Sequence, residues 1–227
     1  MKTISLLSLL FFTTILYSQN EYKGITIKAG ISKPRYDFLN IDLANSTIKS
    51  ELINKLNFNY GAEFFYTSGT FALKGGISLE DKGFKKKYTV LGTYQQPLNE
   101  PIPISSTLNA RYFNANLSAG MNVLDKEKFN IAVYGTYSLG LLIISKETTV
   151  YDNEENESQP SNLMNSIINR RVNSYALSLD FNYYILPELG VVVSPFIQKD
   201  ARAIEQYLIF ATKFTLGTNI GVRYYIN

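Results

Sequence analysis

The sequence contains no cysteine and no histidine. Without cysteine the chain can form no disulfide, no zinc–thiolate site and no lipid anchor on an N-terminal cysteine. Without histidine, Ser–His and Asp–His hydrolytic mechanisms and histidine-ligated metals are excluded as well. An enzyme built on this chain would have to use paired carboxylates or lysine, so we expect a non-enzymatic protein with no cofactor.

Long apolar runs and dense charge are also missing. The longest apolar stretch after the N-terminus, Leu139–Ile144, is far shorter than the about 20 residues that a transmembrane helix needs. Lys and Arg total 22 against 19 Asp and Glu, and no basic stripe marks a nucleic-acid surface. If the chain spans a membrane, it must do so as a closed β-barrel, since an open sheet leaves backbone groups unsatisfied in lipid.

Residues 1–18 have the pattern of a secretory signal peptide. Lys2 provides the positive start, Leu6–Leu16 the short apolar run, and Ser18 a small residue before the expected cleavage. An N-terminal membrane anchor is the alternative, but the apolar run is too short to span a bilayer. We therefore predict an exported protein with one domain over residues 19–227.

Apolar and polar residues alternate strictly in the segments that follow. Phe58, Tyr60, Ala62, Phe64 and Tyr66 form one such apolar series, and Phe214, Leu216, Ile220, Val222 and Tyr224 belong to another. Successive strand side chains point to opposite faces, so each segment has one apolar and one polar face. Most glycines fall on the polar face, and Gly75 and Gly135 are exceptions. This pattern is typical of a transmembrane barrel with a crowded polar interior.

Eight strands are predicted, near 23–33, 57–67, 71–81, 107–123, 129–145, 172–185, 190–198 and 212–226. Short connections at 68–70, 124–128 and 186–189 alternate with long ones at 34–56, 82–106, 146–171 and 199–211. Outer-membrane barrels alternate short periplasmic turns with long extracellular loops. The predicted fold is therefore all-β, an eight-stranded antiparallel up-and-down transmembrane barrel with both termini in the periplasm. Pro195, inside a strand, predicts a bulge or local break.

Three stretches resemble one known family. They are the signal peptide that ends in Ser18-Gln19, the Gly-Ile-Ser-Leu-Glu-Asp-Lys-Gly-Phe segment at 76–84, and the closing Gly-Val-Arg-Tyr-Tyr at 221–225. Together they are similar to the PorT-like outer-membrane β-barrel family of Gram-negative bacteria that use type IX secretion. The resemblance covers the whole mature chain and implies an outer-membrane location and insertion by the barrel-insertion machinery. It also implies secretion-system proteins as candidate partners.

Charged residues on the polar faces predict an ion-pair network in the lumen. Its expected members are Lys28, Glu63, Lys74, Asp180 and Arg223. If Tyr66 stands opposite Phe71, Glu63 faces Lys74 directly; a tighter turn on Gly69-Thr70 makes the two diagonal neighbours. An eight-stranded barrel is just filled by side chains, so we expect a plug rather than an ion path. A carboxylate site using Glu63, Glu80 or Asp180 is the enzymatic alternative.

The predicted loops carry two further charged groups. Lys85, Lys86 and Lys87 could contact lipid phosphates at the outer rim, or could belong to a solvated basic loop. The acidic residues between Asp152 and Glu157 match no EF-hand, so we predict no metal site.

We expect the long loops to act in binding or envelope structure, with outer-membrane lipid and an extracellular ligand as partners. Two other hypotheses remain open at this stage. One is an accessory role in type IX secretion or gliding. The other is a soluble periplasmic carrier resembling a lipocalin, which would have an apolar interior and a charged exterior.

Overall fold

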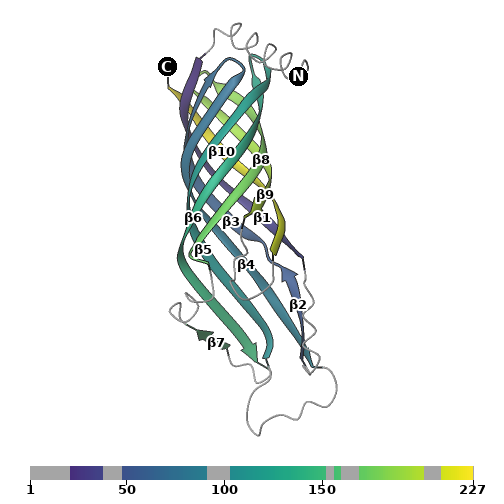
Figure 1. The fold of residues 1–227 in the computed structure, drawn as a ribbon. Helices are drawn as coiled ribbons and strands as arrows, with labels where there is room; N and C mark the ends of the chain where they lie inside the picture. Colours follow the sequence, from purple (N-terminus) through teal and green to yellow (C-terminus); the bar gives the residue numbers. More distant parts are fainter. Residues whose placement is uncertain are drawn as a thin grey trace, which may run out of the picture.

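The computed structural model describes residues 21–37, 48–90, 103–151, 156–159, 169–201 and 211–226. These residues form β-strands joined by short turns (Figure 1). The strands are β1 (Glu21–Asp37), β2 (Ile48–Asn54), β3 (Asn57–Ser68), β4 (Phe71–Val90), β5 (Pro103–Asp125), β6 (Phe129–Tyr151), β7 (Asn156–Gln159), β8 (Arg171–Leu186), β9 (Leu189–Asp200) and β10 (Ala211–Ile226). The predicted signal peptide, residues 1–18, lies outside the described residues.

Eight of the strands close into an antiparallel barrel. The pairing runs β4-β3-β1-β10-β9-β8-β6-β5, and β5 pairs with β4 again to complete the ring. The first strand therefore pairs with the last, with Ile25 opposite Tyr224 and Ile27 opposite Val222. Closure gives every barrel strand two hydrogen-bonded neighbours, which removes exposed edges. The predicted fold class is confirmed.

The three predicted short connections all lie at one end of the barrel. They join β3 to β4, β5 to β6 and β8 to β9, and the first contains Gly69 at a φ of 61°. β1 begins and β10 ends at this same end, since Glu21 pairs with Ser68 and Lys23 with Ile226. We call it the turn end; it is uppermost in Figure 1.

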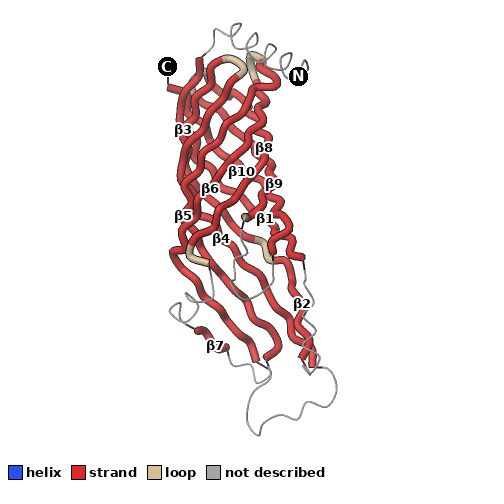
Figure 2. The backbone as a smooth tube through the Cα atoms, viewed as in Figure 1, coloured by secondary structure: helices blue, strands red, loops and turns tan. Residues whose placement is uncertain are grey.

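At the opposite end, which we call the rim end, several strands continue well beyond the rest of the barrel. β5 and β6 each contain 23 residues and β4 contains 20, whereas about 9–11 residues cross a bilayer. Figure 2 shows these strands continuing as an extended sheet. The prediction that 82–106 and 146–171 are loops was therefore wrong at residues 82–90, 103–106, 146–151 and 156–159, which are strand. The alternation persists there, because Phe84 and Leu108 point inward and stay buried.

The outer surface of the barrel is apolar. Exposed fractions reach 69% for Ile27, 67% for Leu117 and 61% for Ile220. A soluble protein rarely leaves so continuous an apolar surface in water. Charged residues such as Asp180 and Arg223 are buried inside at the same time. Apolar outside with polar inside is the arrangement that a barrel adopts in a lipid bilayer.

We call this apolar outer surface the belt. Aromatic side chains border it at both ends. Phe71, Phe129, Tyr183 and Tyr224 are exposed near the turn end, and Phe113 and Tyr175 are exposed toward the rim end. Such rings favour the interface between lipid and water. Tyr22, at the turn end, is not one of these exposed rings and packs edge-on against Tyr225 at a centroid distance of 6.2 Å. No helix among the described residues is long and apolar enough to cross a membrane.

The structure agrees with two predictions about the backbone: that the polar face is the crowded one, and that Pro195 interrupts its strand. A Cβ at Gly75 would contact nothing within 4 Å, whereas one at Gly76 would lie 2.3 Å from the Ala62 carbonyl oxygen. The polar face is thus the crowded interior face.

Pro195 interrupts the β8–β9 ladder, which pairs Ser178 with Phe196 and resumes at Phe181 and Val193 in unchanged register. The predicted local break is present, without a bulge.

Candidate functional site

The lumen contains an ion-pair network that links five strands. Lys28 Nζ lies 2.5 Å from Glu63 Oε2, and Lys74 Nζ lies 3.5 Å from Glu63 Oε1. Lys74 also pairs with Asp180, whose Oδ2 lies 3.0 Å from Arg223 Nη2. The structure thus places all five predicted lumen residues in one continuous group. We call this group the inner ion-pair layer.

The turn between β3 and β4 decides how Glu63 and Lys74 meet. Ser68 pairs with Phe71, so only Gly69 and Thr70 form the turn, and Glu63 stands opposite Gly76 while Lys74 stands opposite Phe65. Glu63 and Lys74 are therefore diagonal neighbours, as the tighter of the two predicted turns requires. The direct pairing is excluded, since it would need Tyr66 opposite Phe71.

Hydrogen bonds and aromatic rings support the inner ion-pair layer. Ser194 donates to Asp180 Oδ1 at 2.8 Å, and Arg223 Nε donates to Thr26 Oγ1 at 3.0 Å. Lys74 Nζ lies 3.6 Å from the centre of the Tyr134 ring. Buried charges are costly unless they are both paired and hydrogen-bonded. These contacts satisfy that requirement from several strands at once, so the layer fixes the barrel's cross-section.

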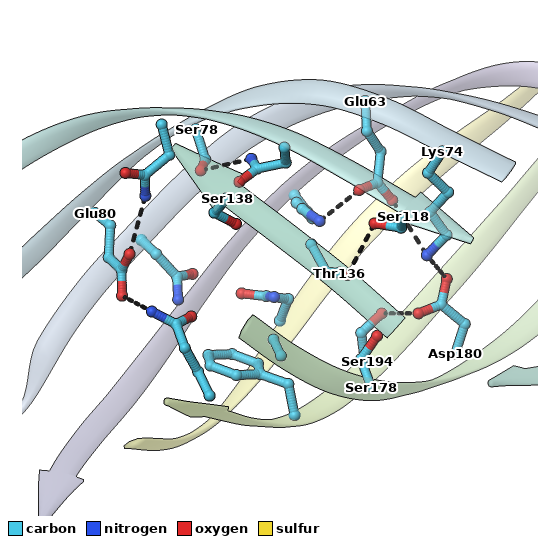
Figure 3. Close-up of a pocket in the computed structure, with 18 of the residues that line it drawn as sticks. Glu63, Lys74, Ser78, Glu80, Ser118, Thr136, Ser138, Ser178, Asp180 and Ser194 are labelled. Atoms are coloured by element: carbon cyan, nitrogen blue, oxygen red, sulfur yellow. Dashed lines mark hydrogen bonds and ion pairs between the residues drawn. The ribbon is translucent and has the colours of Figure 1, made fainter. Parts of the chain in front are cut away.

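A small polar cavity lies on the rim side of this layer (Figure 3). Its volume is about 90 Å³, enough for a few water molecules. Hydroxyl and amide side chains line much of it, including Ser78, Asn116, Ser138 and Ser178. Ser118 and Thr136 are hydrogen-bonded to each other at 2.8 Å. The cavity suits water or a very small polar solute.

A second group of charges, the rim ion-pair layer, closes the other side of the cavity. Lys82 Nζ lies 2.8 Å from Asp200 Oδ1 and 3.2 Å from Glu80 Oε1. Asn114 and Gln198 donate to Glu80 at 2.9 and 3.1 Å, so this carboxylate is fully engaged. The lumen thus contains two charged layers with polar space between them.

The rim ion-pair layer lies beyond the apolar belt. On the outer face the residues next to it include three charged ones, namely Asp81 and Arg111, which pair at 2.6 Å, and Lys199. Burial opposes the charged form of Lys82, but the carboxylates of Asp200 and Glu80 outweigh it and raise its pKa above the ordinary value. Burial also opposes the charged form of Asp200, yet Lys82 and hydrogen bonds hold its pKa below the ordinary value.

Lys82 and Asp200 were missed in the sequence because both fell in predicted loops. The available signal was parity along the strand. Lys82 continues the inward series of Lys74 and Glu80, and Asp200 continues that of Ser194 and Gln198. This continuation was missed because the charged segments beyond residues 81 and 198 were assigned as loops. Glu80, a lumen-facing residue and a candidate enzymatic carboxylate in the sequence, belongs to this layer rather than to the inner one.

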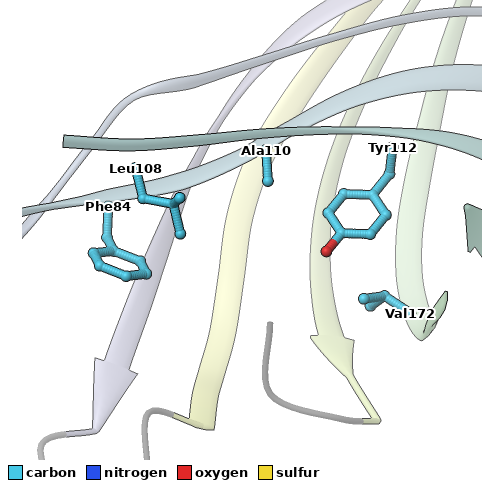
Figure 4. Packing of buried hydrophobic residues seen from close by; sticks show 5 residues of the cluster. All are labelled: Phe84, Leu108, Ala110, Tyr112 and Val172. Carbon is cyan, nitrogen blue, oxygen red and sulfur yellow. The ribbon is translucent and has the colours of Figure 1, made fainter. Parts of the chain in front are cut away.

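The lumen at the rim end is apolar rather than polar. Phe84, Leu108, Ala110, Tyr112 and Val172 pack together there, each no more than 2% exposed (Figure 4). Tyr112 donates its hydroxyl to the Asn169 carbonyl oxygen at 2.9 Å. The expectation of a wholly polar lumen was therefore wrong at this end. The cluster fills the barrel between the rim ion-pair layer and the rim end.

The three predicted phosphate-contacting lysines do not share one surface. They are consecutive on β4, so Lys85 and Lys87 point outward and are exposed, whereas Lys86 points to the inner face. Lys86 Nζ lies 5.1 Å from the centre of the Phe84 ring. A strand cannot present three consecutive side chains to one face. Only Lys85 and Lys87 can contact a lipid outside the barrel.

The chemistry available in the lumen is limited. Glu63, Glu80, Asp180 and Asp200 each accept from a cation, a hydroxyl or an amide. Among the described residues, no group of three or more acidic side chains could hold a metal ion. Each of these carboxylates thus has a partner within the lumen.

No family model matches the sequence, and no curated protein sequence matches it. Solved structures do match the fold. Ail, the attachment invasion locus protein of Yersinia pestis, crystallised with the heparin analogue sucrose octasulfate, is 12% identical with a TM-score of 0.43, over 92% of this chain and 100% of that one. Neisserial surface protein A is 9% identical with a TM-score of 0.43, over 91% and 99%. The outer membrane protease OmpT of Escherichia coli is 9% identical with a TM-score of 0.38, over 92% and 98%. Similarity at this level carries no information about function.

Proposed function

We propose that this protein is a non-enzymatic, integral outer-membrane β-barrel with a closed lumen, acting through the part that extends beyond the membrane. The observation that carries the proposal is that the barrel is apolar outside and charged inside, the reverse of a soluble protein. Ile27 and Leu117 are largely exposed on the outside, while Asp180 and Arg223 are 1% and 3% exposed inside. Lipid satisfies the first condition and the ion pairs satisfy the second.

In this proposal both termini lie in the periplasm and the rim end faces the exterior. The turn end supports this orientation, because it holds the three short connections and both chain ends of the barrel. Outer-membrane barrels place short turns in the periplasm. The extended strands β4, β5 and β6 then form the extracellular surface through which a ligand or envelope partner would bind. Insertion would depend on the barrel-insertion machinery.

The absence of an enzymatic role is part of the proposal. It is supported by the cavity, which at about 90 Å³ is too small for a lipid or peptide substrate. It is also supported by the engagement of Glu63 and Glu80 in ion pairs. A catalytic carboxylate needs both access to substrate and a free position for proton transfer.

Membership of the PorT-like family, and with it a role in type IX secretion, is a finer hypothesis. Its support is the resemblance of the segments at 76–84 and 221–225. If the protein is a secretion accessory, deletion of its gene should abolish export of type IX cargo by the bacterium. A soluble lipocalin-like carrier is less consistent with the geometry, because its interior would have to be apolar where Lys74 and Asp180 pair.

The test is electrophoretic mobility of the membrane-extracted protein before and after boiling, together with conductance in planar bilayers. We expect a heat-dependent shift in the outer-membrane fraction and no stable conductance, since two charged layers and an apolar cluster close the lumen. A soluble protein without a shift would rule out the membrane assignment. Steady conductance by the folded form would rule out the closed lumen.

A further inference from the structure

Cationic side chains surround the outside of the barrel just beyond the apolar belt at the rim end. They point outward from six of the barrel strands and are exposed or partly exposed: Lys33, Arg35, Lys85, Lys87, Arg111, Lys146, Arg171 and Lys199. We call this set the cationic collar. Among the side chains that the structure describes there, the outward acidic ones are Asp81, paired with Arg111, and Glu51, opposite Lys87.

The two ends of the outer surface differ in charge. At the turn end the exposed acidic and basic residues are nearly balanced, being Glu21, Asp125, Glu127 and Glu188 against Lys23, Lys126 and Lys128. The collar has a large excess of positive charge. It also adjoins the belt, since Ile31, Phe113 and Ile197 lie two residues along their strands from collar members. That is the depth at which lipid headgroups meet a membrane protein.

One part of the collar forms a defined site. Arg35 stands opposite Phe214 across the β1–β10 ladder, and its guanidinium carbon lies 5.5 Å from the centre of the Phe214 ring. Phe214 in turn lines an external groove of about 490 Å³ together with Lys199. The apolar walls of the groove include Tyr175, Leu177 and Ile197. Two cations thus flank one aromatic ring at the rim side of an apolar groove.

We propose that this site binds an anionic phospholipid-type molecule of the surrounding leaflet, with its phosphate between Arg35 and Lys199. One acyl chain would lie in the groove over Leu177 and Ile197. Arginine and lysine are the usual partners of phosphate, and the groove's apolar walls match a hydrocarbon chain. The rest of the collar holds further headgroup phosphates less specifically. This inference rests on the proposed membrane location and adds the partner's chemistry to it.

The experiment is native mass spectrometry of the folded, full-length mature protein in detergent. The probes are dimyristoyl phosphatidylglycerol and dimyristoyl phosphatidylcholine, which share acyl chains and differ in net charge. We expect the anionic lipid to bind more tightly, and R35Q/K199Q to weaken it roughly tenfold to thirtyfold. K23Q/K126Q, which removes two exposed cations at the turn end, is the matched control and should bind like the wild type.

Three outcomes would overturn the site. They are equal binding of the two lipids, an unchanged affinity in R35Q/K199Q, and full displacement of the lipid by millimolar inorganic phosphate, which would indicate a free-anion site instead. Heat-dependent mobility of each variant confirms that it is folded. A protein that shows that shift but no lipid preference would refute the site while leaving the membrane barrel intact.

Discussion

Lys74 and Asp180 form an ion pair across the lumen, although 106 residues separate them in the sequence. They lie on β4 and β8, which are not neighbours in the barrel. Arg223 contacts the same carboxylate from β10 at 3.0 Å. One acidic side chain therefore holds three strands together, and it can do so only after the barrel has closed.

Replacement of Asp180 should strongly destabilise the protein. In D180N, Lys74 and Arg223 stay buried without their shared anion, and breaking a buried ion pair costs about 3–5 kcal/mol. The measurement is the urea midpoint of the heat-modifiable form in detergent. D125N, at an exposed position at the turn end, is the control. An equal midpoint for the two variants would contradict the role given to Asp180.

Glu63 and Lys74 should be energetically coupled. A double-mutant cycle with E63Q and K74M is expected to give an interaction energy of about 0.5–3 kcal/mol, because each side chain is buried beside the other. The partly exposed pair Asp81–Arg111 offers a comparison and should give less than about 1 kcal/mol. Strict additivity for Glu63 and Lys74 would show that they are not partners.

Two adjacent glycines should differ in their response to an added methyl group. In G76A the new Cβ would lie 2.3 Å from a backbone oxygen and 2.6 Å from the Glu63 Cα, so the strand must shift. We expect a loss of about 1–3 kcal/mol. In G75A the Cβ meets nothing within 4 Å, and stability should change little. Similar unfolding midpoints for both variants would contradict the assignment of the crowded face to the interior.

The rim ion-pair layer should make stability depend on pH. The pKa of Asp200 is held low in the folded state by Lys82 and hydrogen bonds, while an unfolded aspartate has a pKa near ~3.9. The carboxylate therefore contributes stability above about pH 4 and loses it as the pH falls through the folded pKa. The pKa of Lys82 is raised, so this lysine stays charged throughout. The stability difference between wild type and D200N should shrink below about pH 4; a constant difference would count against the pairing.

The barrel itself could be predicted because the features that determine it, strand alternation and turn length, involve residues close together in the sequence. Alternation along each strand fixes the inward face, and short turns fix which strands pair. The diagonal contact of Glu63 and Lys74 followed from one turn, Gly69-Thr70, whose length allowed two registers. The partnership of Lys74 with Asp180 needed the strand count and the depth of each residue as well. Both could be read from the sequence.

The extended strands and the rim ion-pair layer could not be read in the same way. Beyond the belt the outward residues become polar, so the contrast between faces weakens and segments such as 82–90 resemble loops. Their strand pairing depends on neighbours distant in sequence, as with Lys82 and Asp200. The groove beside Lys199 depends on the placement of Phe214 from another strand, which alternation alone does not reveal.

The rim extension of β4, β5 and β6 has a consequence for solubility outside the membrane. Once these strands leave the closed ring, they form an open sheet whose two borders would expose unpaired backbone groups. β2 pairs with β4 along one border, and β7 pairs with β6 along the other. The chain thereby supplies its own border strands. Removal of residues 48–54 would expose the β4 border to strand addition by another molecule, so self-association would begin there rather than at the barrel wall.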